Sequence, residues 1–95
     1  MLKHVVCFKM DGEQSAKEAV EVLKSMQGKV PMLKGLEVGL DVLRSARSYD
    51  VYLSVLLEDR AALDAYQSDP YHCDVVKVFM HKHMTASVAV DFILD

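Results

Sequence analysis

Hydrophobic and polar positions alternate along the first ten residues of the chain. A strand over residues 2–10 would place one set on one face: Leu2, His4, Val6, Phe8 and Met10. The other face would carry Lys3, Val5, Cys7 and Lys9. Because both faces include apolar side chains, we expect both to be covered. Asp11-Gly12 then gives a turn signal that ends the strand.

The pattern changes to a helical spacing after this turn. Ser15-Ala-Lys-Glu18 matches a capping box, in which Ser15 accepts from a free backbone N–H and Glu18 reaches back. The apolar stripe of the predicted helix is Ala16, Ala19, Val20, Leu23 and Met26. Gln27-Gly28 predicts the helix end.

Two further strands follow, over residues 36–43 and 49–57. The first would carry Leu36, Val38, Leu40 and Val42 on one face. The second would carry Tyr49, Val51, Leu53, Val55 and Leu57 on one face, and Tyr52, Ser54 and Leu56 on the other. The polar link from Arg44 to Ser48 is short, so we expect the two strands to form an antiparallel hairpin.

A broken helical region precedes the last strand. Asp59 is a candidate cap for a short helix, whose stripe would be Ala61, Leu63, Ala65 and Tyr66. Asp69-Pro70 predicts a second cap followed by Pro at the first helical position. The apolar stripe of that second helix would be His72, Val75, Val76, Phe79 and His83. Residues 85–93 are rich in β-branched side chains and predict the last strand.

The order β-α-β-β-α-β predicts an α+β, ferredoxin-like fold in a single domain over residues 1–95. We expect a four-stranded antiparallel sheet with helices on one face. The other face would be left open, with Val5, Cys7, Tyr52, Ser54 and Leu56 on it. An apolar face of this kind points to a partner, and a two-fold homodimer is the commonest solution.

Composition narrows the function classes. The net charge is −3 with signs mixed along the chain, and the absence of a basic patch argues against nucleic-acid binding. No apolar run reaches the ~20 residues of a membrane span, and residues 1–10 fit a strand better than a signal peptide. Two cysteines, Cys7 and Cys73, are too few for a disulfide framework, so we expect reduced thiols and a cytoplasmic location. No motif for a phosphate, dinucleotide or other cofactor is present.

Three residues are candidates for acid–base chemistry. His4 on the first strand and His72 on the helix stripe would both point into the space between sheet and helices. His72 in the first helical turn would stay neutral near pH 7 and accept a proton, while Tyr66 would polarise a carbonyl. The rings of His4 and His72 are also compatible with core positions that do no chemistry, in which each has one backbone hydrogen bond. The predicted pocket lining is Val6, Phe8, Val20, Leu23, Leu53 and Phe79.

Other polar residues carry weaker signals. His81 and His83, with His72, do not match a zinc-ligand spacing, and alternate residues on a helix diverge, so we expect no metal. Asp91 near the end of the chain is expected to have a structural role.

The chain resembles the stress-responsive A/B barrel (Dabb) domain family almost from end to end. The matching segments are Lys3-His4-Val5-Val6 with Phe8-Lys9, Val30-Pro31 with Leu33-Lys34-Gly35-Leu36, Gly39, Tyr49-Asp50, Ala65-Tyr66-Gln67-Ser68-Asp69-Pro70 with His72, and Val90-Asp91. The family often has His where Asp69 stands. The resemblance implies a dimeric α+β barrel, and many members have no established activity and are associated with stress responses.

One plant branch of the family is similar to a polyketide cyclase that closes a ring by aldol condensation. The resemblance implies that His72 is the base and that Tyr66 and His4 orient carbonyl oxygens. The cyclase has aromatic side chains on the first helix where this chain has Ala19, Val20 and Leu23. We therefore expect a pocket of different shape and a different substrate.

Three functions stay open from the sequence. The first is a small dimeric protein of unestablished activity that either is stress-associated or binds a small apolar or carbonyl-containing ligand in a pocket between sheet and helices. The second is a cofactor-free cyclase-, lyase- or isomerase-like enzyme with His72 as general base. The third is a protein whose assembly is itself the function.

Overall fold

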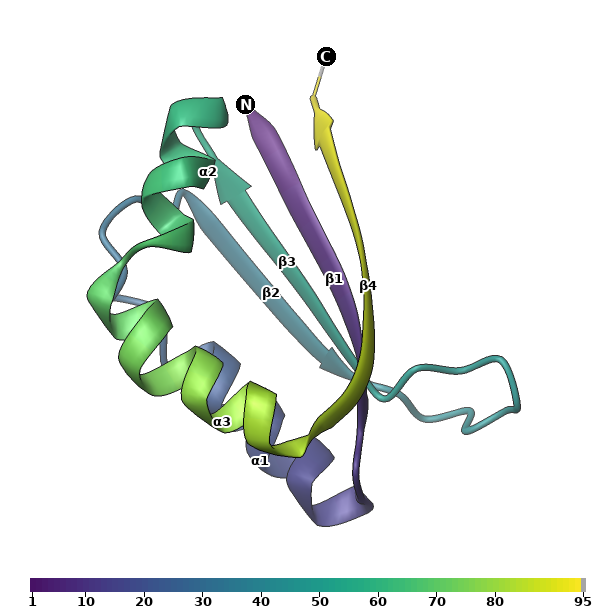
Figure 1. Cartoon of the computed structure of the whole chain (residues 1–95). Helices are drawn as coiled ribbons and strands as arrows, with labels where there is room; N and C mark the ends of the chain where they lie inside the picture. The colour runs from purple at the N-terminus through teal and green to yellow at the C-terminus, as the bar shows by residue number, and fades with distance from the viewer. Residues whose placement is uncertain (95) are drawn as a thin grey trace.

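The computed structural model describes residues 1–94, which form a four-stranded sheet with helices on one face (Figure 1). In chain order the elements are β1 (Leu2–Met10), α1 (Glu13–Lys24), β2 (Gly35–Leu40), β3 (Val51–Leu57), α2 (Arg60–Gln67), the π-helical turn η1 (His72–Val76), α3 (Lys77–His83) and β4 (Met84–Ile93). The predicted ferredoxin-like order is confirmed, with its second helical region divided into α2 and the η1–α3 segment.

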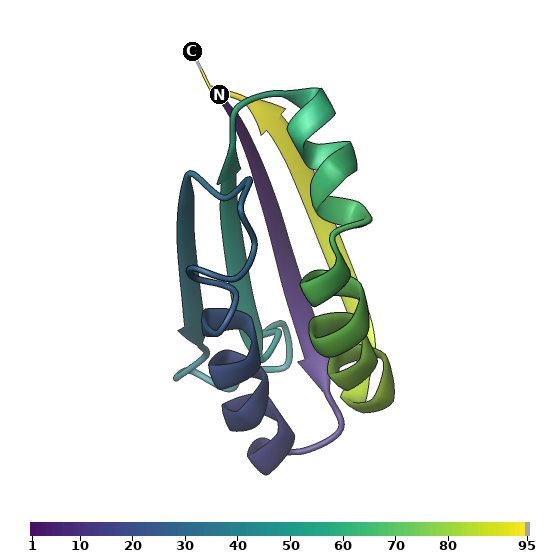
Figure 2. The same cartoon turned by 90° about the vertical axis from the view of Figure 1, so that its left-hand side faces the viewer.

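The sheet has the strand order β2-β3-β1-β4, and every pairing in it is antiparallel. The predicted hairpin between the second and third strands is therefore confirmed. β1 lies between β3 and β4, so that His4 is opposite both Val55 and Asp91. Figure 2 looks onto the helical layer, where α1 and the η1–α3 segment lie side by side in front of the sheet.

Alternation along β1 and β3 builds the inner, helix-covered face of the sheet. Its buried apolar side chains are Leu2, Val6, Phe8 and Met10 on β1, and Val51, Leu53, Val55 and Leu57 on β3. Ala19, Leu23 and Met26 from the α1 region pack against them and are buried as well. Each buried Leu or Val side chain contributes about 1.5–3 kcal/mol. This interlayer space is therefore the core, as the alternation predicts.

Both predicted aspartate caps are confirmed. Asp59 accepts a hydrogen bond from the Ala62 N–H at 2.9 Å at the start of α2. Asp69 accepts from the His72 N–H at 3.0 Å, and helical structure begins at Pro70. Because Pro lacks an N–H and has a helical φ, it suits this first position. The Asp69 cap thereby sets the start of the helix that carries His72.

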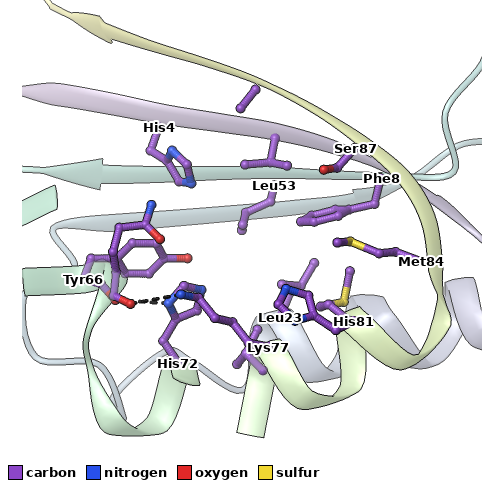
Figure 3. A pocket seen from close by; sticks show the side chains of 15 residues that line it. His4, Phe8, Leu23, Leu53, Tyr66, His72, Lys77, His81, Met84 and Ser87 are labelled. Atoms are coloured by element: carbon purple, nitrogen blue, oxygen red, sulfur yellow. Dashed lines mark hydrogen bonds between the residues drawn. The ribbon is translucent and has the colours of Figure 1, made fainter. Parts of the chain in front are cut away.

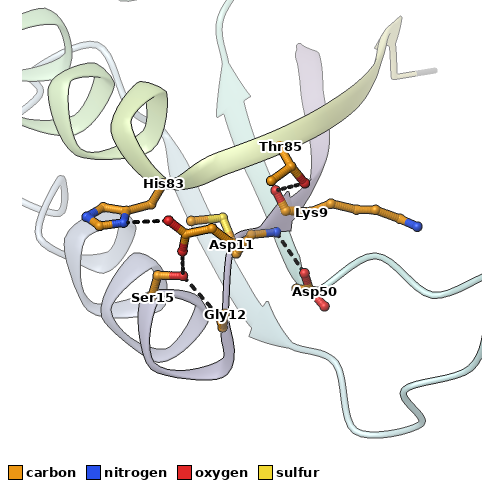
Figure 4. Close-up of polar contacts among 8 residues, drawn as sticks. Lys9, Asp11, Gly12, Ser15, Asp50, His83 and Thr85 are labelled. Carbon is orange, nitrogen blue, oxygen red and sulfur yellow. Dashed lines mark hydrogen bonds and ion pairs between the residues drawn. The ribbon is translucent and has the colours of Figure 1, made fainter.

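The predicted capping box at Ser15 is wrong, because α1 begins earlier, at Glu13. Ser15 lies inside the first turn, where its hydroxyl donates to the Asp11 carboxylate and to the Gly12 carbonyl (Figure 4). Asp11 also accepts from His83 Nδ1 at 3.1 Å. The carboxylate before the helix thus takes the hydroxyl that the motif assigned to a backbone N–H. Hydrogen bonds to Ser15 and His83 hold the pKa of Asp11 below its usual value.

The hairpin loop is longer than predicted, because β2 ends at Leu40 and β3 begins at Val51. Asp41 takes part in a local turn by accepting from the Arg44 N–H at 2.7 Å, and Arg44 has a positive φ of 56°. The prediction that Val42 continues the strand on the face of Leu36, Val38 and Leu40 is wrong, since Val42 lies in the loop and is 91% exposed. The loop projects from the sheet on the side opposite the helices (Figure 1).

The helical stripes are shifted from their predicted residues. In α2 the half-buried positions are Ala62 and Leu63, whereas Ala61 and Ala65 are exposed. In η1 the Lys77 N–H donates to the His72 carbonyl, five residues back, which widens the turn. The wider turn places Val76 in the core and leaves Val75 43% exposed. Among residues 1–94, no helix is long and apolar enough to cross a membrane.

The outer face of the sheet carries a second apolar surface. The five residues predicted for the open face lie on this surface. Ser54 is buried, and Val5, Cys7, Tyr52 and Leu56 are half-buried. β4 extends this surface with three exposed side chains, Val88, Val90 and Phe92. No other segment of residues 1–94 covers it (Figure 1). We call these eight residues the outer face.

Replacing Asp69 by Ala should lower the free energy of unfolding by about 0.5–2 kcal/mol, because the cap on the His72 N–H is lost. Urea denaturation measures this change. Asp64→Ala is the matched control, since Asp64 is exposed on α2 and should change stability little. Equal effects of the two substitutions would contradict the capping role.

Candidate functional site

A cavity of about 220 Å³ lies between the inner face of the sheet and the helices (Figure 3). Its apolar lining consists of Val6, Phe8, Leu23, Leu53, Val76, Met80, Met84 and Ala89. Its polar lining consists of His4, Tyr66, Gln67, His72, Lys77, His81 and Ser87. An apolar cavity of about 150 Å³ holds benzene. This one therefore has room for a ring with a short substituent.

His72 is buried in the cavity wall with one ring nitrogen committed to the backbone. Its Nδ1 lies 3.0 Å from the Tyr66 carbonyl oxygen. Because a carbonyl only accepts, Nδ1 carries the proton and Nε2 has a free lone pair in the neutral ring. Burial lowers the pKa of His72 below 6.5, although the bond to the Tyr66 carbonyl acts in the opposite direction. The ring is therefore neutral at pH 7.

The Nε2 atom of His72 can be reached from the cavity. Among residues 1–94, no hydrogen-bond partner contacts it. Every fully buried side-chain nitrogen or oxygen in this part of the chain does have a partner. The unpartnered Nε2 must therefore be accessible to solvent, and the accessible side of His72 is the cavity that it lines. A neutral, accessible imidazole nitrogen is a competent proton acceptor.

The Tyr66 ring contacts the rings of both histidines. It stacks on His72 with centroids 4.2 Å apart and contacts His4 edge-on at 5.7 Å. The hydroxyl donates weakly to the Met26 sulfur at 3.8 Å. Burial, and secondarily the charge of Asp69, raises the pKa of Tyr66, so the phenol stays protonated and remains a donor. A carbonyl oxygen is a stronger acceptor than a thioether and would compete for this proton.

His4 is held by a residue that the sequence analysis assigned only a structural role. Its Nδ1 is hydrogen-bonded to the Asp91 carboxylate across the β1–β4 pairing. A carboxylate only accepts, so Nδ1 donates and the second nitrogen, Nε2, is free of protein partners among residues 1–94. The His4 side chain is 10% exposed and that of Asp91 is 41% exposed. Strand register alone brings these residues together, and one sequence does not reveal that register.

Lys77, His81 and Gln67 add polar groups to the cavity that the sequence analysis missed. Lys77 follows η1 and donates from Nζ to the Gln67 carbonyl at 3.0 Å. His81 lies one turn further along α3, on the same side as Lys77. Lys77 and His81 are four residues apart, and this spacing is the sequence signal that places them on one helix face. The π-helical turn then directs that face to the cavity.

The lining differs in two places from the sequence prediction. Val6, Phe8, Leu23 and Leu53 line the cavity, but Val20 and Phe79 do not. Phe79 instead packs its ring against His83 at 4.7 Å, because the wide η1 turn brings Met80 inward. Val20 is half-buried against the core outside the cavity.

The histidines of α3 diverge. His81 lines the cavity, whereas His83 pairs with Asp11 at the far end of the helix. Within residues 1–94, no group of three or more His, Cys, Asp or Glu is placed to hold a metal ion. The cysteines are both free thiols.

The geometry brings His4 from the sheet and Tyr66 and His72 from the helical layer to one end of the cavity, with two free imidazole nitrogens and one phenol (Figure 3). Such a set can accept a proton at one point and donate a hydrogen bond at another. The apolar remainder of the lining would hold a small organic molecule.

Comparisons with known proteins place this geometry in a family context. The sequence matches the stress responsive A/B barrel domain over residues 2–94. No curated protein matches the chain.

Solved structures share the fold. A dimeric ferredoxin-like protein of unknown function from Thermobifida fusca is 23% identical, with 98% of this chain and 90% of that chain covered and a TM-score of 0.84. A Dabb family protein from Mesorhizobium loti is 18% identical, with 98% and 95% covered and a TM-score of 0.82. A hydroxynitrile lyase from Passiflora edulis is 14% identical, with 99% and 93% covered and a TM-score of 0.80.

NMR titration of the His72 ring should give a pKa below 6.5 and the tautomer with the proton on Nδ1. As pH falls below 6.5, the unfolded chain then binds a proton at His72 before the folded chain does. The free energy of unfolding should therefore fall as the pH is lowered through this window and rise as the pH is raised. His72→Gln should remove this contribution. A ring that titrates at or above 6.5, or that carries its proton on Nε2, would contradict the assignment.

Proposed function

The chain belongs to the stress-responsive A/B barrel (Dabb) domain family, and we propose that it is a homodimer whose cavity binds a small carbonyl compound and transfers a proton next to the carbonyl. No cofactor takes part in this proposal. The observation that carries it is the accessible Nε2 of a neutral His72 beside the protonated Tyr66 phenol. A pair with these protonation states can act as base and hydrogen-bond donor at pH 7.

The proposed step uses the residues in distinct roles. His72 Nε2 takes a proton from the carbon next to the carbonyl, and the electron pair of the broken C–H bond forms an enolate. Tyr66 donates a hydrogen bond to the enolate oxygen, leaving its contact with Met26. His4, oriented by Asp91, offers a second nitrogen to the same ligand. The imidazolium of His72 then returns the proton to carbon or to a product.

The relatives are consistent with both binding and catalysis. The hydroxynitrile lyase of Passiflora edulis shows that this fold is found in an enzyme. The Thermobifida fusca protein has the same fold and no known function. Identity to each is too low to transfer a substrate. The proposal therefore rests on the His72–Tyr66 geometry in this chain.

The outer face supports the homodimer. Val88, Val90 and Phe92 of β4 are 50%, 62% and 41% exposed and adjoin the half-buried side chains of β1 and β3. Exposed apolar surface of this kind is usually covered by a partner. The loop between β2 and β3 projects to the same side (Figure 1) and carries Val42 and Leu43, which are 91% and 77% exposed. A second copy facing this surface would cover both.

Proton transfer is tested by deuterium exchange at the carbon next to the carbonyl of 4-phenylbutan-2-one in D₂O, followed by NMR. The wild-type protein should accelerate exchange over buffer, and His72→Gln should slow that catalysed exchange by about 10²–10⁴-fold. The acidic limb of the rate profile should lie below pH 6.5, because the pKa of His72 is lowered. His83→Gln is the control, since His83 lies outside the cavity. Exchange at the wild-type rate in His72→Gln would show that His72 is not the base.

Homodimerisation is tested with a charge on the outer face. Val90→Glu should convert the dimer to a monomer in light scattering, because the carboxylate would be buried without a partner. Val78→Glu is the matched control, since Val78 on α3 is 61% exposed and Val90 is 62% exposed. A wild-type monomer at micromolar concentration, or a dimer that survives Val90→Glu, would rule out this interface.

A further inference from the structure

The cavity carries basic side chains and no acidic ones. His4, His72, Lys77 and His81 line it, whereas among residues 1–94 no Asp or Glu does. The chain as a whole has the opposite balance, with 14 acidic and 11 basic residues. The two buried or nearby carboxylates are already engaged, Asp69 by the His72 N–H and Asp91 by His4. The electrostatic character of the cavity therefore differs from that of the surrounding protein.

Lys77 is the principal cation of this site. Its ammonium donates to the Gln67 carbonyl at 3.0 Å, which uses one of its three donors. Among residues 1–94 it forms no salt bridge. Its side chain is half-buried, so its charge is less well hydrated than that of a lysine on the open surface. An anion would accept a hydrogen bond from one of the two remaining N–H donors of this ammonium.

Lys77 and His81 form one continuous wall with His72. The Lys77 N–H donates to the His72 carbonyl, so Lys77 follows His72 by one turn of the π-helix. His81 follows Lys77 by four residues and lies on the same side of α3. One helical turn rises on the order of 5 Å. An acid group held at Lys77 would thus be only a few bonds from a carbon held at His72.

From this arrangement we propose that the cavity takes an organic acid that carries a carbonyl group, with its carboxylate at Lys77 and His81 and its carbonyl at Tyr66 and His72. This inference rests on the proposed function, since it names the class of ligand that the same cavity binds. Lys77 supplies a charge-assisted hydrogen bond to the carboxylate, and His81 supplies a second donor at the mouth. The apolar side chains of the lining, Phe8 and Leu53 among them, contact the remainder of the ligand.

The test uses a matched pair of probes, 4-oxo-4-phenylbutanoate and its primary amide. They have nearly the same size and shape and differ in the charge of one end. Titration calorimetry with the wild-type protein should show about tenfold tighter binding of the acid, because only the carboxylate gains the charge-assisted bond. Equal affinity for the two probes, or no binding of the acid, would overturn the proposal.

Variants locate the effect at Lys77. Lys77→Met keeps the length and apolar stem of the side chain and should abolish the preference for the acid. Lys77→Arg should retain it. Lys82→Met is the control, because Lys82 is exposed on α3 and does not line the cavity. A preference for the acid that survives Lys77→Met, with the melting temperature unchanged, would assign the binding to another group.

If Lys77→Met lowers the melting temperature strongly, Lys77→Arg is the deciding variant. Loss of the acid preference in this folded variant would overturn the role of Lys77, and its retention would support it.

This experiment separates the ligand class from the proton transfer. If the acid binds through Lys77 but His72→Gln leaves deuterium exchange unchanged, the binding site stands and the catalytic proposal fails. If His72→Gln stops exchange of the neutral ketone but the acid and the amide bind equally, the catalytic proposal stands and the anion site fails.

Discussion

The pairing of β1 with both β3 and β4 is the constraint on which the rest of the structure depends. Antiparallel pairing on both edges puts alternate side chains of β1 either toward the helices or toward the outer face. The inner set packs under α1 and leaves His4 at one end of the cavity. The same register brings Asp91 opposite His4 and places Val90 beside Val5 on the outer face. A slip of one residue would reverse all of these assignments together.

In the segment from Tyr66 to His72, the hydrogen bonds that stabilise the helix start also hold the His72 ring in place. Asp69 caps the helix through the His72 N–H, and the Tyr66 carbonyl holds His72 Nδ1. These bonds position the ring and determine its tautomer. The Tyr66 and His72 rings are stacked, and their burial favours the uncharged state of both groups. Under the proposed function, His72 would accept a proton without changing its tautomer, whereas the Tyr66 hydroxyl would first leave Met26.

β4 connects the cavity with the outer face. Ser87 and Ala89 line the cavity and Asp91 supports His4, whereas Val88, Val90 and Phe92 point to the other side. All of these side chains are exposed in the isolated chain, and β4 has no neighbouring strand on its outer edge. A partner that covered the outer face would therefore contact the same strand that supports His4.

The sequence by itself determined the order of elements, the inner face of β1 and β3, and the Asp59 and Asp69 caps, because these follow from alternation and local hydrogen bonding. It also predicted that His4, Tyr66 and His72 face inward, since strand and helix periodicity place all three on buried sides. Local patterns were insufficient where a neighbouring side chain offered another acceptor, as when the Asp11 carboxylate took the Ser15 hydroxyl. They were also insufficient where the helix widened at η1 and exchanged Phe79 for Met80 in the lining. Only the tertiary structure decided that Asp91 meets His4 and that Lys77 and His81 reach the cavity, because strand register and helix phase depend on contacts between segments far apart in the chain.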